Sequence, residues 1–155
     1  MAADTTTAPQ RFIAGMRDEI RTLDLLREVA REQRAASVPD SGIDLAALVH
    51  RRQDIEDELH RLEQTVRPLR VALAAPGMVP DADERAACEA VQDQARQTVA
   101  DILAIDRDTL AALMAARDTR QARLHHLDTG EATLAAYRRT VRPTTAPKEL
   151  INQVG

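Results

Sequence analysis

The N-terminal part of the chain carries apolar residues every three or four positions, which is the spacing of one face of an α-helix. This pattern predicts a helix over residues 9–37, with Thr7 as its N-cap and Pro9 in its first turn. Pro39 and Gly42 interrupt the pattern after the helix. The predicted apolar face consists of Phe12, Ile13, Met16, Ile20, Leu23, Leu26, Val29 and Ala30.

A second segment with the same spacing predicts a helix over residues 44–75. Pro68 lies inside this segment. Because proline has no backbone N–H, we expect the helix to kink after Val66. Pro76 and Gly77 then predict a turn. The predicted apolar face consists of Leu45, Leu48, Ile55, Leu59, Leu62, Val66, Leu69 and Leu73.

The third segment predicts a helix over residues 82–140, much longer than the other two. Asp83 and Glu84 suit the positive end of the helix dipole in its first turn. Glycine is unfavourable by about 1 kcal/mol in a helix interior, so a hinge or break at Gly130 stays open. The first apolar face of this helix consists of Val91, Ala95, Thr98, Ile102, Ile105, Leu110, Leu113 and Met114.

The lengths of the three segments predict a bundle that the third helix outgrows. The first two helices and residues 82–113 each have about 30 residues, or roughly 45 Å of helix. Short connections make neighbouring helices antiparallel. The bundle is then complete near Leu113, and the third helix continues from about Ala115. The predicted fold is all-α: an antiparallel three-helix, coiled-coil-like bundle with an overlong C-terminal helix and an extended tail.

Together the three helices predict a single helical domain over residues 9–141. Residues 1–8 precede it as a disordered N-terminus. Residues 142–155 follow as an extended tail, because Pro143 and Pro147 prevent a helix there.

A second apolar set begins after a polar gap in the third helix. Its members are spaced for one helix face, but an isolated helix of this kind is marginally stable in water. We therefore expect a partner to cover the set, with two arginines at its edge. The predicted partner-binding residues are Leu124, Leu127, Leu134, Tyr137, Arg138 and Arg139.

Composition favours long helices and a soluble protein of uneven charge. The chain has 155 residues with one Phe, one Tyr and no Trp, which is typical of coiled coils rather than of wide cores. Its net charge of −4 argues against general nucleic-acid binding. Residues 115–155 carry seven basic and four acidic side chains, so they have a charge of +3 and residues 1–114 have −7. The predicted partner-binding residues lie in the positive part.

Neither a membrane span nor a secretion signal is predicted. No segment approaches the roughly 20 apolar residues that a transmembrane helix needs. The N-terminus, MAADTTTAPQ, has no basic region followed by an apolar one. The expected location is the cytoplasm.

The residues able to bind metals or act as nucleophiles do not form a motif. Adjacent His125 and His126 point about 100° apart on a helix, and His50 and His60 lie nearly three turns apart. We expect all four to be solvated rather than metal ligands. Cys88 has no second cysteine or nearby histidine in the sequence, so we expect it to be a small apolar core residue. No cofactor or metal is predicted.

One segment, ILAIDRDTLAALMAAR, resembles the first helix of the all-helical chorismate mutases. Those enzymes need further helices and a lysine on this helix, but here only a helix end and a proline-rich tail follow. The sole lysine is Lys148. The same rhythm is that of any amphipathic helix with exposed charges. We therefore expect the protein not to be an enzyme.

Three other segments resemble the FlgN/FliT-like class of bacterial flagellar type III export chaperones. They are RLEQTVRPLR, LHHLDTGEATLAAYRR with its Leu-x-x-Leu-x-x-Gly-x-x-x-Leu-x-x-Tyr-Arg pattern, and the tail KELINQVG. With ILAIDRDTLAALMAAR they span about residues 44–155. The first helix contributes only its length and amphipathicity to the resemblance.

This resemblance implies a non-enzymatic cytoplasmic chaperone. Such proteins bind hook-associated or filament-cap proteins before export and present them to the export apparatus, with much of the substrate contact in the C-terminal helical region. The implied partner is an amphipathic helical segment of a flagellar secretion substrate, which the second apolar set would cover by helix packing. The alternative is a coiled-coil homodimeric adaptor or scaffold with no export role.

Overall fold

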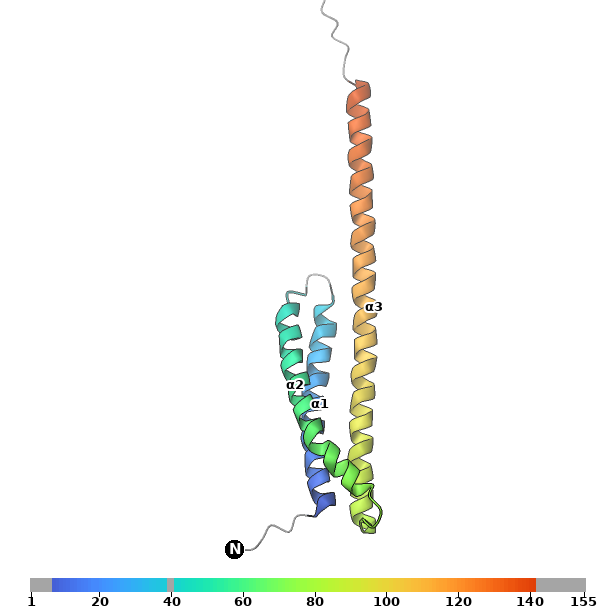
Figure 1. The fold of residues 1–155 in the computed structure, drawn as a ribbon. Helices are drawn as coiled ribbons and strands as arrows, with labels where there is room; N and C mark the ends of the chain where they lie inside the picture. The colour runs from blue at the N-terminus through green and yellow to red at the C-terminus, as the bar shows by residue number, and fades with distance from the viewer. Residues whose placement is uncertain (1–6, 39–40, 142–155) are drawn as a thin grey trace, which may run out of the picture. The chain divides into compact units, whose positions relative to one another are not determined.

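The computed structural model describes residues 7–38 and 41–141, which form three α-helices (Figure 1). They are α1 (Ala8–Ala36), α2 (Leu45–Leu73) and α3 (Ala82–Val141). The chain divides into two compact units, Met1–Ala116 and Arg117–Gly155. The helices of the first unit pack against one another, which confirms the predicted all-α bundle.

The predicted helix boundaries agree with the structure to within two residues at each end. α3 continues through Gly130, so no break occurs there. Thr7 is the N-cap of α1, which confirms the predicted cap, whereas Ala8, placed in the predicted disordered segment, is the first residue of the helix. The rest of the predicted disordered segment, residues 1–6, and the predicted tail 142–155 lie outside the described residues.

Side-chain caps determine where α1 and α2 begin. The hydroxyl of Thr7 accepts a hydrogen bond from the backbone N–H of Gln10, whose side chain accepts one from the Thr7 N–H in return. Asp44 accepts bonds from the N–H groups of Ala46 and Ala47. These bonds satisfy N–H groups that the first turn of a helix leaves unpaired.

One core cluster joins the beginning of α1, the end of α2 and the beginning of α3. Gly15 lets α1 and α2 approach here, because a Cβ at this position would lie 2.7 Å from Cγ2 of the fully buried Val66. Cys88 is part of the cluster, as expected for a small apolar residue. The buried members are Phe12, Met16, Ile20, Val66, Cys88 and Val91.

The other core cluster joins the second half of α1 to the first half of α2 and the middle of α3. The beginning of α1 therefore contacts the end of α2, and the second half of α1 contacts the first half of α2, as expected for antiparallel neighbours. Ile102 is the last buried residue of α3 up to residue 139, and Ile55, Leu59 and Ile105 pack against this cluster while partly exposed. The buried members are Leu23, Leu26, Ala30 and Ile102.

The prediction that the core face of α3 continues through three further apolar residues is wrong. Leu110, Leu113 and Met114 are 59%, 39% and 48% exposed. Ile102 and Ile105 of α3 face the core. The next residues on the same side of the helix are small and half-buried. Leu110 comes five residues after Ile105, which turns it about 140° around the helix and away from the core. The half-buried residues are Thr109, Ala112 and Ala116.

α2 contains Pro68 within its C-terminal half, where Figure 1 shows the helix changing direction. A proline removes one backbone hydrogen bond and clashes with the preceding turn, so a bend is expected there. The bent part still contributes the fully buried Val66 to the core. Over the described residues, α1, α2 and α3 each lack a stretch long and apolar enough to cross a membrane.

Candidate functional site

The predicted partner-binding residues lie on the helical part of the second unit. We call Leu124, Leu127, Leu134 and Tyr137 the C-terminal apolar surface; their exposed fractions are 61%, 66%, 56% and 64%. Arg138 and Arg139 are exposed as well, like every residue from 117 to 139. The second unit therefore presents three large leucines to solvent without a core of its own in the described residues.

The leucines of this surface share one side of the helix. Leu127 and Leu134 are seven residues apart and so lie about 20° apart around the axis, while Leu124 lies about 60° from Leu127. Gly130, three residues after Leu127 and four before Leu134, lies between them on the same side. A Cβ at Gly130 would meet no atom within 4 Å. Gly130 therefore leaves a gap between the side chains of Leu127 and Leu134.

The charge around this surface is positive. Arg138 and Arg139 occupy the last turn of α3, where the negative end of the helix dipole favours cations. Arg117 pairs with its neighbour Asp118 at 3.0 Å. Across residues 117–139 five arginines outnumber three acidic side chains, which favours a partner with acidic flanks. The acidic side chains are Asp118, Asp128 and Glu131.

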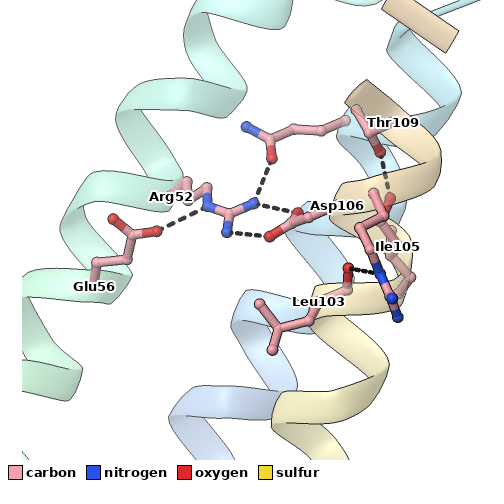
Figure 2. A network of polar contacts seen from close by, with 8 residues as sticks. Arg52, Glu56, Leu103, Ile105, Asp106 and Thr109 are labelled. Carbon is pink, nitrogen blue, oxygen red and sulfur yellow. Dashed lines mark hydrogen bonds and ion pairs between the residues drawn. The ribbon is translucent and has the colours of Figure 1, made fainter. Parts of the chain in front are cut away.

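A polar network links all three helices within the first unit (Figure 2). Arg52 of α2 donates two hydrogen bonds of 2.8 Å to the carboxylate of Asp106 in α3, one of 3.0 Å to Gln33 of α1 and one of 2.8 Å to Glu56. The hydrogen bonds to Asp106 are the main cause that raises the pKa of Arg52. A guanidinium fork paired with a carboxylate in this way positions helices and has no free group for chemistry.

A pocket of about 470 Å³ opens between α1, α2 and α3 in the first unit. We call it the Glu19 pocket. Glu19 is 7% exposed and its Oε1 has no hydrogen-bond partner. Burial is the main cause that raises the pKa of Glu19; Arg70 lowers it and Glu63 raises it further. The lining residues are Met16, Glu19, Leu23, Leu59, Glu63, Arg70, Gln92, Ala95, Arg96 and Val99.

Sequence analysis missed Glu19 as a residue of interest. The signal was present, because Glu19 lies three residues after Met16 and four before Leu23, inside the apolar face of the first helix. A carboxylate in such a face is rarely buried without a partner. The pocket is lined by residues of all three helices, so the pattern of one helix could not locate it.

The four histidines are exposed, as predicted for solvated side chains. Among the described residues, only the imidazole of His60 lies within hydrogen-bond distance of another side chain, the amide of Gln64 at 3.5 Å. Over residues 7–38 and 41–141, no three His, Cys, Asp or Glu side chains gather where they could hold a metal ion. Burial is the main cause that raises the pKa of the Cys88 thiol, with Glu84 and Glu89 adding to it. A raised pKa makes this thiol a poor nucleophile.

Comparisons of the chain with protein families, with curated proteins and with solved structures gave no match. The resemblance to flagellar export chaperones therefore depends on the quoted sequence motifs. The C-terminal apolar surface and the Glu19 pocket are the two features of the described residues where a ligand or partner could bind.

Proposed function

We propose that this protein is a non-enzymatic cytoplasmic chaperone that binds an amphipathic helical segment of a flagellar axial protein before export. The observation that supports binding is the C-terminal apolar surface, where Leu124, Leu127 and Leu134 are each more than half exposed. The flagellar identity of the partner is supported by the resemblance of LHHLDTGEATLAAYRR and the other segments. Hook-associated and filament-cap proteins are the candidate cargoes.

Packing of a partner helix onto this surface is physically favourable. Full burial of one leucine side chain contributes about 1.5–3 kcal/mol. Three leucines and one tyrosine therefore contribute an amount comparable with the roughly 8 kcal/mol of a micromolar complex, before the entropic cost of association. Gly130 adds shape, because a partner side chain can enter between Leu127 and Leu134 as a knob enters a hole.

A homodimeric adaptor is the second candidate, favoured by the same seven-residue spacing of Leu127 and Leu134. Glu131 bears on this candidate, since it lies four residues after Leu127 and three before Leu134 and so falls at a seam position. A parallel, in-register dimer would place two Glu131 carboxylates opposite each other, which is destabilising. An antiparallel dimer avoids this repulsion, so the dimer candidate is restricted to that arrangement.

The testing experiment replaces the two central leucines by charged residues in the full chain. Leu127→Glu with Leu134→Glu should abolish binding to the purified terminal segments of hook-associated and cap proteins, measured by calorimetry. The matched control is Ala122→Glu with Ala136→Glu, which adds the same charge on roughly the opposite side of the helix. The control should bind within about threefold of the unsubstituted protein, because charges on the opposite side of the helix are screened over about 8–10 Å at physiological ionic strength.

Two measurements separate the candidates. Circular dichroism should show that both double variants keep their helical content. Sedimentation should show a monomer for the unsubstituted protein if the surface is reserved for cargo. A dimer that the leucine substitutions dissociate, with no binding to any axial segment, would replace the chaperone proposal by the adaptor.

A further inference from the structure

The Glu19 pocket has apolar walls and a single buried charge. Its walls include Met16 and Leu23 from α1, Leu59 from α2 and Val99 from α3. Among the ionisable residues that line the pocket, Glu19 alone is buried. A volume of about 470 Å³ lies within the roughly 300–1,000 Å³ of small-molecule sites, which combine apolar walls with few polar groups in this way.

No other charged lining residue forms an ion pair with Glu19, although Arg70 partly offsets the effect of burial on its pKa. Arg70, Glu63 and Arg96 are exposed, so water solvates them at the rim. Arg96 is paired with Asp93 at 2.5 Å. Arg70 donates only to the sulfur of Met16, at 3.9 Å, and no described carboxylate lies within ion-pair distance of it. The buried carboxyl group is therefore the polar feature of the pocket that lacks a partner.

A buried carboxyl group whose Oε1 has no hydrogen bond is costly, and the cost falls when a donor in the pocket bonds to that group. A positively charged donor forms a bond about twice as strong as a neutral one. An anionic ligand would face Glu19 across apolar walls and would be repelled. The walls favour an unbranched apolar chain behind the donor, since such a chain covers Met16, Leu59 and Val99 together.

We propose that the Glu19 pocket binds a small organic ligand with a primary ammonium group on an unbranched apolar chain. The ammonium group donates to the Glu19 carboxylate, and the chain lies against the apolar walls. This site is in the first unit and is independent of the partner surface in the second unit, so either proposal can fail without the other.

The test titrates three probes of equal chain length, n-hexylamine, n-hexanol and hexanoate, into the full-length protein. The methyl group of Met16 lines the pocket and reports binding by NMR, while the methyl groups of Met78 and Met114 serve as internal references. Hexylamine should shift the Met16 signal at the lowest concentration, hexanol at a higher one and hexanoate not at all. Equal or tighter binding of hexanoate would overturn the proposal.

Substitution of Glu19 decides whether the carboxylate selects the amine. Glu19→Gln keeps the shape, and it should weaken hexylamine about tenfold while changing hexanol little, because only the charge-assisted bond is lost. Glu28→Gln, on the same helix but exposed and outside the pocket lining, should change hexylamine affinity less than about threefold. Equal hexylamine affinity in the unsubstituted and Glu19→Gln proteins would overturn the proposal. Circular dichroism confirms that each variant is folded.

A lysine side chain carries the same ammonium group, so a further probe separates the two sources. Nα-acetyl-lysinamide has the ammonium on a four-carbon chain but ends in polar amides that the apolar walls would not favour. Weaker binding than hexylamine supports the small-molecule site. Tighter binding would assign the pocket to a lysine of a protein partner and would overturn the proposal.

Discussion

Gly15 and Gly130 are both interior helix residues, yet the structure gives them different roles. At Gly15 a Cβ would lie 2.7 Å from Cγ2 of Val66, whereas at Gly130 it would meet nothing within 4 Å. The first glycine permits two helices to approach, and the second leaves a gap on an exposed surface. Their propensities are equal, so only the neighbouring side chains distinguish them.

Gly15→Ala should destabilise the first unit. Alanine is the better helix former by about 1 kcal/mol, but the added methyl group must displace the fully buried Val66, and overpacking typically costs about 1–3 kcal/mol. We expect a lower urea midpoint. The matched control Gly130→Ala should leave this midpoint unchanged and raise the helical signal, since nothing opposes its methyl group. A Gly15→Ala protein that is more stable than the parent would show that α1 and α2 do not approach at this residue.

Glu19→Gln should stabilise the protein in a pH-dependent way. Burial raises the folded-state pKa of Glu19 above its ordinary value of 4.5, with Arg70 opposing and Glu63 adding to the shift. The folded state therefore binds the proton more tightly, and stability falls as pH rises from about 4.5 through the folded pKa. The stability difference between the variant and the parent should be smallest near pH 4 and should grow to a plateau.

Urea denaturation between pH 4 and pH 8 measures this difference. Glu28→Gln is the control, because Glu28 is an exposed carboxylate on the same helix and does not line the Glu19 pocket. A difference between Glu19→Gln and the parent that stays constant over the whole range would contradict a raised pKa at this residue.

At the scale of elements, the ion pair between Arg52 and Asp106 joins α2 to α3 within one helical turn of the buried Leu48. Beyond Ile105 the core side of α3 carries small residues and Leu113, which is 39% exposed, so polar groups add to the contact there. The two side chains of the pair are 22% and 32% exposed, which protects their bond from full screening. The network in Figure 2 therefore adds polar contacts to the apolar packing at this end of the bundle.

Arg52→Gln should cost about 1–3 kcal/mol of folding stability, because Asp106 and Gln33 lose their donor in a partly buried site. The control on the same helix is Arg61→Gln, whose pair with Glu58 is exposed at 71% and 48% and should matter by less than about 1 kcal/mol. A double-mutant cycle with Asp106→Asn gives the coupling energy. Equal effects of the two arginine substitutions would mean that the network does not hold the helices.

At the scale of the whole molecule, the two compact units differ in how they are stabilised. Every buried apolar residue among those described lies between Pro9 and Ile102, inside the first unit. Residues 117–139 are all exposed. Folding of the first unit therefore does not depend on burial of residues in the second.

Truncation after Asp118 should leave the unfolding transition of the first unit nearly unchanged, within about 0.5 kcal/mol, as for substitutions away from any core. The same truncation should remove binding to the proposed cargo, measured by calorimetry with the full-length protein as reference. Urea denaturation followed by circular dichroism gives the stability. If the truncated protein were unfolded, the leucines of the C-terminal apolar surface would belong to the core.

Much of the fold could be predicted from the sequence because helices depend on local patterns. The three-to-four-residue spacing of residues such as Phe12, Met16 and Ile20, the cap at Asp44 and the breakers around Gly42 and Gly77 act over a few residues each. The exposure of Leu124, Leu127 and Leu134 was predicted in the same way, from helix length. Their role in partner binding remains a prediction that the proposed experiments test.

The tertiary structure decided which positions of these helices are inside. The phase of α3 turned Leu110 outward, although it is as apolar as Ile102, whereas Leu113 lies on the side of Ile102 and is still 39% exposed. The approach of α1 to α2 gave Gly15 its role, and the three helices together enclosed Glu19 without a partner for its Oε1. Periodicity specifies a face of one helix, but burial depends on what the other helices place against that face.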